Sequence, residues 1–306
     1  MRRADLIHLG LLLVSLAMAY VLPFELLLLS YIVLGPAHYF TEISWLHDRS
    51  YFMPTRIFAI VLAAAALGGM FIAHPYWSGV LLWCCFLAAG LAALGLSLRR
   101  SLMLGVVAAT ATILMVMAGA PFRIVGILLP TLIHVSIFTL AFMTLGALRS
   151  RSPIQFALIG AYLAAIAAIP IAPPSAATVI PVFAKLGQDF FGDIAPSLGR
   201  LFGVPDLQFA GRITGLLSFV YTYHYLNWFI KADVTRWANI PRRRLIGVVV
   251  LSAASTGLCF YNYTIGITVL LLVSLLHVLL EFPLNTIAIR DLAAMPLGRS
   301  ARPSTA

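Results

Sequence analysis

Charged residues are scarce in this sequence, and their scarcity excludes an ordinary soluble fold. Asp, Glu, Lys and Arg make up 10% of the 306 residues, whereas hydrophobic residues make up 62%. A soluble domain must wet its exterior, and charged residues usually supply about a quarter of its composition. The composition therefore predicts an integral membrane protein.

Cysteine is also rare, and the familiar histidine boxes are missing. Cys84, Cys85 and Cys259 all lie in apolar segments, without the spacing of a thiolate metal site. The His-x-x-x-His and His-x-x-His-His patterns of membrane desaturases and alkane hydroxylases do not occur. We therefore expect the cysteines to pack as small apolar side chains.

The formal net charge of +10 would suit a nucleic-acid-binding protein if the basic residues formed a surface patch. Instead they occur singly or in short clusters between apolar runs, a distribution typical of topology signals in membrane proteins. We therefore expect a membrane partner and no nucleic acid.

Apolar runs long enough to cross a hydrocarbon core of about 30 Å recur along the chain. Prolines such as Pro75, Pro121 and Pro153 fall at the turns between them, as helix breakers should. We predict an all-α integral membrane protein with a single domain over residues 1–306, a polytopic bundle of about ten transmembrane helices. The predicted spans are residues 5–22, 24–42, 56–74, 77–98, 101–119, 123–147, 153–172, 207–230, 244–263 and 265–287.

The basic residues indicate an orientation for these spans. With the N-terminus in the cytoplasm, only four of the 20 Lys and Arg, namely Arg123, Lys185, Arg200 and Arg212, fall on the outer side. A wrong number of spans would scramble this alternation, so the positive-inside rule predicts that the N- and C-termini are both cytoplasmic. The expected location is the inner membrane of a bacterium.

Residues 173–206 form one long extracytoplasmic segment outside the predicted spans. Its apolar residues, among them Phe183, Leu186 and Phe190, have the spacing of an interfacial amphipathic helix. The segment is either a linker that caps the bundle or a lid over an entrance for lipid.

Ionisable residues inside the spans are the candidates for chemistry, because a polar group buried in a bilayer needs a compensating partner. His38 and Glu42, like His277 and Glu281, are four residues apart and therefore share one face of a helix. In the predicted orientation these groups lie at one level, in the cytoplasmic half of the bilayer. The full set of candidate metal ligands is His38, Glu42, His134, His224, His277 and Glu281.

Imidazole and carboxylate ligands suit iron, zinc or manganese better than copper(I), which prefers sulfur. We predict a bound metal ion, with iron as the first choice and zinc as the second. The alternative is that each His–Glu pair is an ion pair or a helix-packing contact without a metal. His8 and His74, near span ends, are expected to make structural hydrogen bonds only.

Four residues are candidate catalytic groups. Glu42 and Glu281 could act as bases beside the metal, and Lys231 and Asp233 follow the span that contains His224. The alternative for Lys231 and Asp233 is a role as interfacial anchors or as residues that orient the ligands.

The stretch LGPAHYFTEISWLHDRSYF, which contains His38 and Glu42, resembles the Gly-x-x-His-x-x-x-Asp opening of the Brp/Blh-type carotenoid dioxygenases. Those are polytopic membrane enzymes that hold iron with four histidines and cleave a carotenoid to retinal. The resemblance implies that His38 is an iron ligand, with His134 and His224 as the next candidates in chain order. The chain departs from the family pattern in having Glu42 for Asp and Trp228 where a second late histidine is expected.

These features predict a membrane-embedded metalloenzyme, an iron-dependent oxygenase or hydroxylase that acts on a lipid or other lipid-soluble molecule. A cytoplasmic electron donor is the expected partner. A zinc-dependent lipid hydrolase and a proton- or metal-coupled transporter are the alternatives, since buried His and Glu could activate water or relay protons. The sequence shows no inverted repeat of the kind many transporters have.

Overall fold

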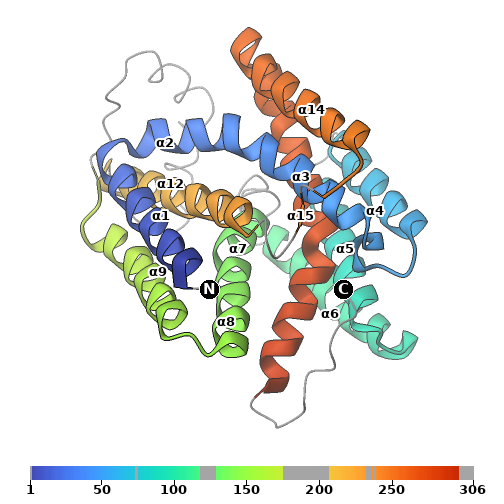
Figure 1. Ribbon diagram of the computed structural model, residues 1–306. Helices are drawn as coiled ribbons and strands as arrows, with labels where there is room; N and C mark the ends of the chain where they lie inside the picture. Colours follow the sequence, from blue (N-terminus) through green and yellow to red (C-terminus); the bar gives the residue numbers. More distant parts are fainter. Residues whose placement is uncertain are drawn as a thin grey trace. The chain divides into compact units, whose positions relative to one another are not determined.

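The computed structural model describes residues 2–72, 75–117, 129–174, 207–231, 236–237 and 239–295, and no strand occurs among them. Figure 1 shows the helices in chain order. They are α1 (Arg2–Val21), α2 (Pro23–Leu29), η1 (Ser30–Leu34), α3 (Gly35–His47), η2 (Ser50–Phe52), α4 (Arg56–Gly69), α5 (Pro75–Leu94), α6 (Leu98–Met117), α7 (Leu129–Ile133), η4 (His134–Phe138), α8 (Thr139–Ser150), α9 (Pro153–Ile171), α12 (Leu207–Ile230), α14 (Arg242–Tyr261) and α15 (Tyr263–Ala294).

Six helical segments in the described part of the chain are long and apolar enough to cross a membrane. One of them, Pro23–His47, is the continuous run of α2, η1 and α3, and another is Pro130–Ser150. The prediction of an all-helical membrane protein is thus confirmed for the described residues. The number of crossings and the side on which the termini lie stay predictions, as does the interfacial helix, because residues 175–206 lie outside the described part.

The exposed surface of several helices is apolar. Side chains more than half exposed include Leu6, Leu13 and Val14 on α1, and Val249 and Val250 on α14. Water penalises a continuous apolar surface of this kind, whereas the hydrocarbon interior of a bilayer accepts it. The lengths and surfaces of these helices together indicate an integral membrane protein.

The described helices belong to two compact units. The first comprises Met1–His38 and Val135–Leu270, and the second comprises Tyr39–His134 and Leu271–Ala306. In the first unit α12 packs against α1 and α2, and α9 packs against α1, α8 and α12. Its core contains Tyr162 and Tyr223, whose ring centroids are 5.5 Å apart.

In the second unit α4, α5 and α6 pack against one another in chain order. Leu82 and Phe86 of α5 share a buried apolar cluster with Leu279 of α15. A Cβ atom at Gly90 would lie 2.9 Å from the ring of Phe282, so a larger residue there would have to displace that side chain. The small residue lets α5 approach the helix that contains His277.

Two helical runs contain π-helical turns, and each turn lies beside a proline. The η1 turn precedes Pro36, and η4 begins at His134, four residues after Pro130. Pro36 has no N–H to donate, so it removes one bond from the helical ladder directly after the wide turn η1. Turns of this type are frequent at functional sites, and both lie within four residues of a histidine predicted to bind metal.

Candidate metal centre

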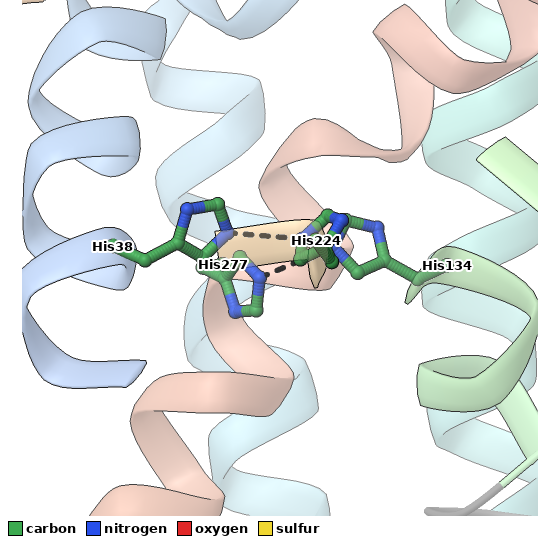
Figure 2. Close-up of side chains that lie close together, drawn as sticks. All are labelled: His38, His134, His224 and His277. Atoms are coloured by element: carbon green, nitrogen blue, oxygen red, sulfur yellow. Dashed lines mark hydrogen bonds between the residues drawn. The ribbon is translucent and has the colours of Figure 1, made fainter. Parts of the chain in front are cut away.

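Four histidines from four helical runs point toward one another (Figure 2). His38 lies in α3, His134 opens η4, His224 lies in α12 and His277 lies in α15. Each offers one ring nitrogen, and these four atoms all lie within 4.8 Å of one another. Every one of these side chains is buried, with at most 9% exposure. The group could therefore hold a metal ion.

The spacing of the nitrogens fits ligands of one ion. The Nε2 atoms of His38 and His224 are 3.2 Å apart, and those of His134 and His277 are 3.3 Å apart. Metal–imidazole bonds of about 2.0–2.2 Å place neighbouring ligand nitrogens about 3.0–3.4 Å apart. Each pair thus already has the separation that adjacent ligands require.

The donor chemistry also favours a cation at this point. A neutral imidazole carries one N–H and one lone pair. A hydrogen bond therefore joins only two of these four nitrogens at a time, one as donor and one as acceptor. A single cation accepts all four lone pairs at once. No cysteine or carboxylate of the described residues belongs to the group, so its ligand set is purely imidazole, which suits iron or zinc.

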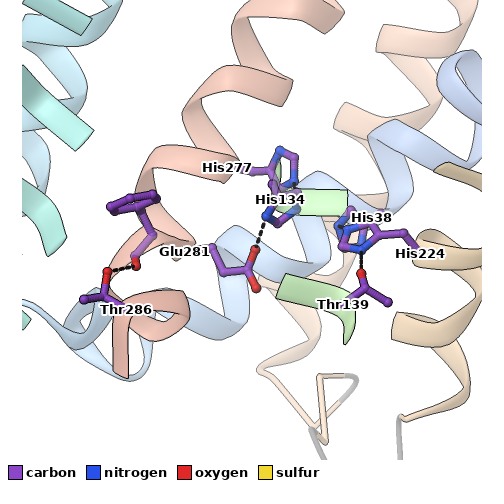
Figure 3. Close-up of polar contacts among 8 residues, drawn as sticks. His38, His134, Thr139, His224, His277, Glu281 and Thr286 are labelled. Atoms are coloured by element: carbon purple, nitrogen blue, oxygen red, sulfur yellow. Dashed lines mark hydrogen bonds and ion pairs between the residues drawn. The ribbon is translucent and has the colours of Figure 1, made fainter. Parts of the chain in front are cut away.

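Glu281 contacts the far side of one imidazole (Figure 3). Its Oε2 atom lies 3.0 Å from Nδ1 of His134, with both side chains buried. A carboxylate at Nδ1 keeps the proton on that nitrogen and leaves Nε2 free to bind metal. Glu42 is also buried, and its carboxyl group interacts electrostatically with that of Glu281.

Thr139 has the equivalent position at a second imidazole. Its hydroxyl lies 2.8 Å from Nδ1 of His224, and both residues are buried. The contact turns the opposite nitrogen, Nε2, toward His38 (Figure 3). Two of the four rings thus have a partner at Nδ1 and present Nε2 to the group.

Aromatic side chains hold the other two rings. Tyr39 stacks on His277 with ring centroids 4.3 Å apart. Tyr225 and Trp228 of α12 contact His38, at 5.0 Å and 5.6 Å between centroids. These bulky neighbours limit the rotation of the imidazoles and exclude water from them.

The remaining predicted residues lie elsewhere or outside the described part. Glu42 and Glu281 are not members of the four-histidine group, although Glu281 adjoins it. Lys231 follows the end of α12 and acts electrostatically on His8, and neither residue belongs to the group. Asp233 and His74 lie outside the described residues.

Sequence reasoning missed Thr139 and Tyr39. Tyr39 follows His38 directly, yet it turns to His277, because neighbouring residues of a helix face different directions. Thr139 lies five residues after His134, yet it contacts His224. Sequence spacing carries no signal for such contacts with another helix.

No protein-family model matches the chain, and no curated protein or solved structure is detectably similar to it.

Proposed function

We propose that the chain is a membrane-embedded metalloenzyme, an iron-dependent oxygenase or hydroxylase that acts on a lipid-soluble substrate. The observation that carries the proposal is the convergence of four buried imidazoles, His38, His134, His224 and His277, in apolar helices. Polar groups in such surroundings are costly and are typical of functional sites.

Iron fits this ligand set better than zinc for catalysis. Four imidazoles would complete the tetrahedral coordination of zinc, whereas a catalytic zinc site normally has three protein ligands and an open position. Iron accepts six ligands in many sites, so four histidines leave positions for small molecules. Bound iron would supply the activation of dioxygen. The short resemblance to histidine-ligated carotenoid dioxygenases supports the same metal.

The residues around the imidazoles have separate tasks in this proposal. Glu281 and Thr139 orient His134 and His224 through their Nδ1 atoms. Tyr39 and Trp228 pack on the other two rings and exclude water. Dry surroundings would suit an apolar substrate that arrives from the bilayer, and electrons would come from a cytoplasmic donor. A bacterial inner membrane is the proposed location.

The test is elemental analysis of the full chain purified in detergent, together with an anaerobic absorption spectrum. We expect about one iron per chain. Alanine at His38, His134, His224 or His277 should lower the metal content several-fold, because each change removes one ligand. His47→Ala is the matched control, since His47 lies on α3 with His38 but outside the group.

Two results would contradict the proposal in different ways. A parent protein without metal, or four variants that keep full occupancy, would remove the metal site altogether. Stoichiometric zinc in place of iron would keep the metal site but contradict the oxygenase. Transmembrane flux of a solute by reconstituted protein would favour a transporter.

A further inference from the structure

The backbone just before His38 is irregular, and a neighbouring helix compensates for it. Pro36 has no N–H, so it cannot donate to the carbonyl of Ile32, four residues earlier. In the π-helical turn the N–H of Gly35 donates to the carbonyl of Ser30, five residues away. A backbone acceptor without its helical donor is costly inside a membrane.

Helix α14 supplies side-chain donors to this break. The hydroxyl of Thr256 donates to the carbonyl of Ile32 at 2.8 Å. The hydroxyl of Ser252, one turn earlier, has one proton to share between the carbonyl of Val248 in its own helix at 2.8 Å and that of Pro36 at 3.3 Å. Because these two residues are four apart, they share one face of α14.

Apart from these two hydroxyl contacts, α14 packs little against the rest of the described protein. Much of its surface is exposed and apolar, as at Ile246, Val249 and Leu251. Its only buried residues are Val248, Ser255 and Cys259. Among the described helices α14 packs chiefly on η1. The two hydroxyls therefore point from a lipid-facing helix to the segment that carries His38.

We propose that Thr256, assisted by Ser252, is a positioning residue for His38. The two hydrogen bonds set the rotation of the chain at Ile32 and Pro36, and His38 follows two residues later. That rotation places its Nε2 atom 3.2 Å from Nε2 of His224. The inference rests on the proposed metal site and assigns α14 a role in building it.

The experiment compares variants of the full chain, purified in detergent and stripped of metal, by titration with Co²⁺. Thr256→Val keeps the shape of the side chain but removes the hydroxyl, and Thr256→Ser restores a hydroxyl. Thr268→Val is the matched control, because the hydroxyl of Thr268 is exposed and bonds only to its own helix, at the carbonyl of Thr264.

We expect Thr256→Val to weaken Co²⁺ binding about tenfold and to shift the visible bands of bound Co²⁺, which report ligand geometry. Thr256→Ser should bind within about twofold of the parent, as should Thr268→Val. The thermal midpoint of Thr256→Val should fall only modestly, because the carbonyl of Ile32 loses its donor but a hydrogen bond between membrane helices adds little stability on average. If Thr256→Val does not fold, Ser252→Ala removes the longer bond and should give a smaller loss with the same shift of the bands.

Unchanged affinity and bands in the folded variants would overturn the positioning role. Failure of Thr256→Ser to restore binding would overturn it as well. A parent chain that binds no Co²⁺ would instead reject the metal site on which the inference rests, so the two failures are distinguishable.

Discussion

At the scale of single residues, the contacts at Nδ1 distinguish a metal site from two hydrogen-bonded histidine pairs. A hydrogen bond between two imidazoles would explain why His38 lies beside His224 and why His134 lies beside His277. It would not explain why Glu281, itself a buried carboxyl group, is placed behind His134. An orienting carboxylate behind an imidazole is a recurrent feature of metal sites.

Glu281→Gln tests this role. The amide keeps the shape of the side chain but removes the charge, so metal affinity should fall roughly 10- to 100-fold while the thermal midpoint changes little. Metal titration and thermal unfolding of the same detergent preparation provide the two measurements. A collapsed midpoint in protein that retains its metal would mean that the carboxyl group is structural.

Glu42→Gln tests the residue next to Glu281, one contact farther from the histidines. Glu42 interacts electrostatically with Glu281 and is not a member of the histidine group, so we expect its effect to pass through Glu281. We expect a loss of metal affinity in the same direction but smaller, on the order of a few-fold. A loss greater than that of Glu281→Gln would indicate that Glu42 is itself a ligand, as the sequence had allowed.

At the scale of helices, the breaks in the helical ladder place the ligands. A π-turn contains one extra residue, and each residue turns the chain by about 100°, so removing the wide turn would rotate the side chains that follow. The turn η1 precedes His38, and η4 begins at His134. Two of the four imidazoles therefore depend on an irregular backbone.

Pro36→Ala restores an N–H and lets the helix become regular through η1. We expect the thermal midpoint to stay level or rise, because proline inside a helix is unfavourable, while metal affinity falls at least about tenfold. Pro170→Ala is the control, since Pro170 also lies inside a helix, α9, which contains none of the four histidines. If Pro36→Ala binds metal as tightly as the parent, the irregular turn does not position His38.

At the scale of the whole molecule, metal binding should couple to stability. An ion that binds only the folded chain stabilises it, by about 2.7 kcal/mol at a concentration of 100 times Kd. A chelator should therefore lower the thermal midpoint of the parent by a few degrees. His277→Ala, which lacks one ligand, should respond little. Equal responses of the two proteins would place the stabilising ion elsewhere.

The orientation in the membrane can be tested independently of the metal. A reporter that works only outside the cytoplasm should be active when fused after Pro75, Pro121 or Lys185. The same reporter should be inactive after Arg151 or Arg244, because these positions belong to cytoplasmic loops in the predicted topology. Activity at Arg151 would contradict the second half of that topology.

The sequence by itself determined the class of the protein and the composition of its site. Apolar runs of membrane length imply helices, because only a helix satisfies its own backbone within one segment of a bilayer. The cost of burying ionisable groups marked His38, His134, His224 and His277 in advance. The predicted helix boundaries were less accurate. Helix α4 ends at Gly69 and α15 continues to Ala294, because helix ends depend on local caps and packing as well as on hydropathy.

Only the tertiary structure decided which groups meet. The spacing of His38 and Glu42 implied that the carboxylates join the ligands, whereas in the structure Glu281 lies behind His134 and Glu42 lies beside Glu281. The contact of Thr139 with His224 joins residues 85 positions apart. Periodicity in the sequence shows on which face of a helix a residue lies. Packing and the π-turns decide how that face is rotated toward neighbouring helices. Neither leaves a periodic pattern in a single sequence.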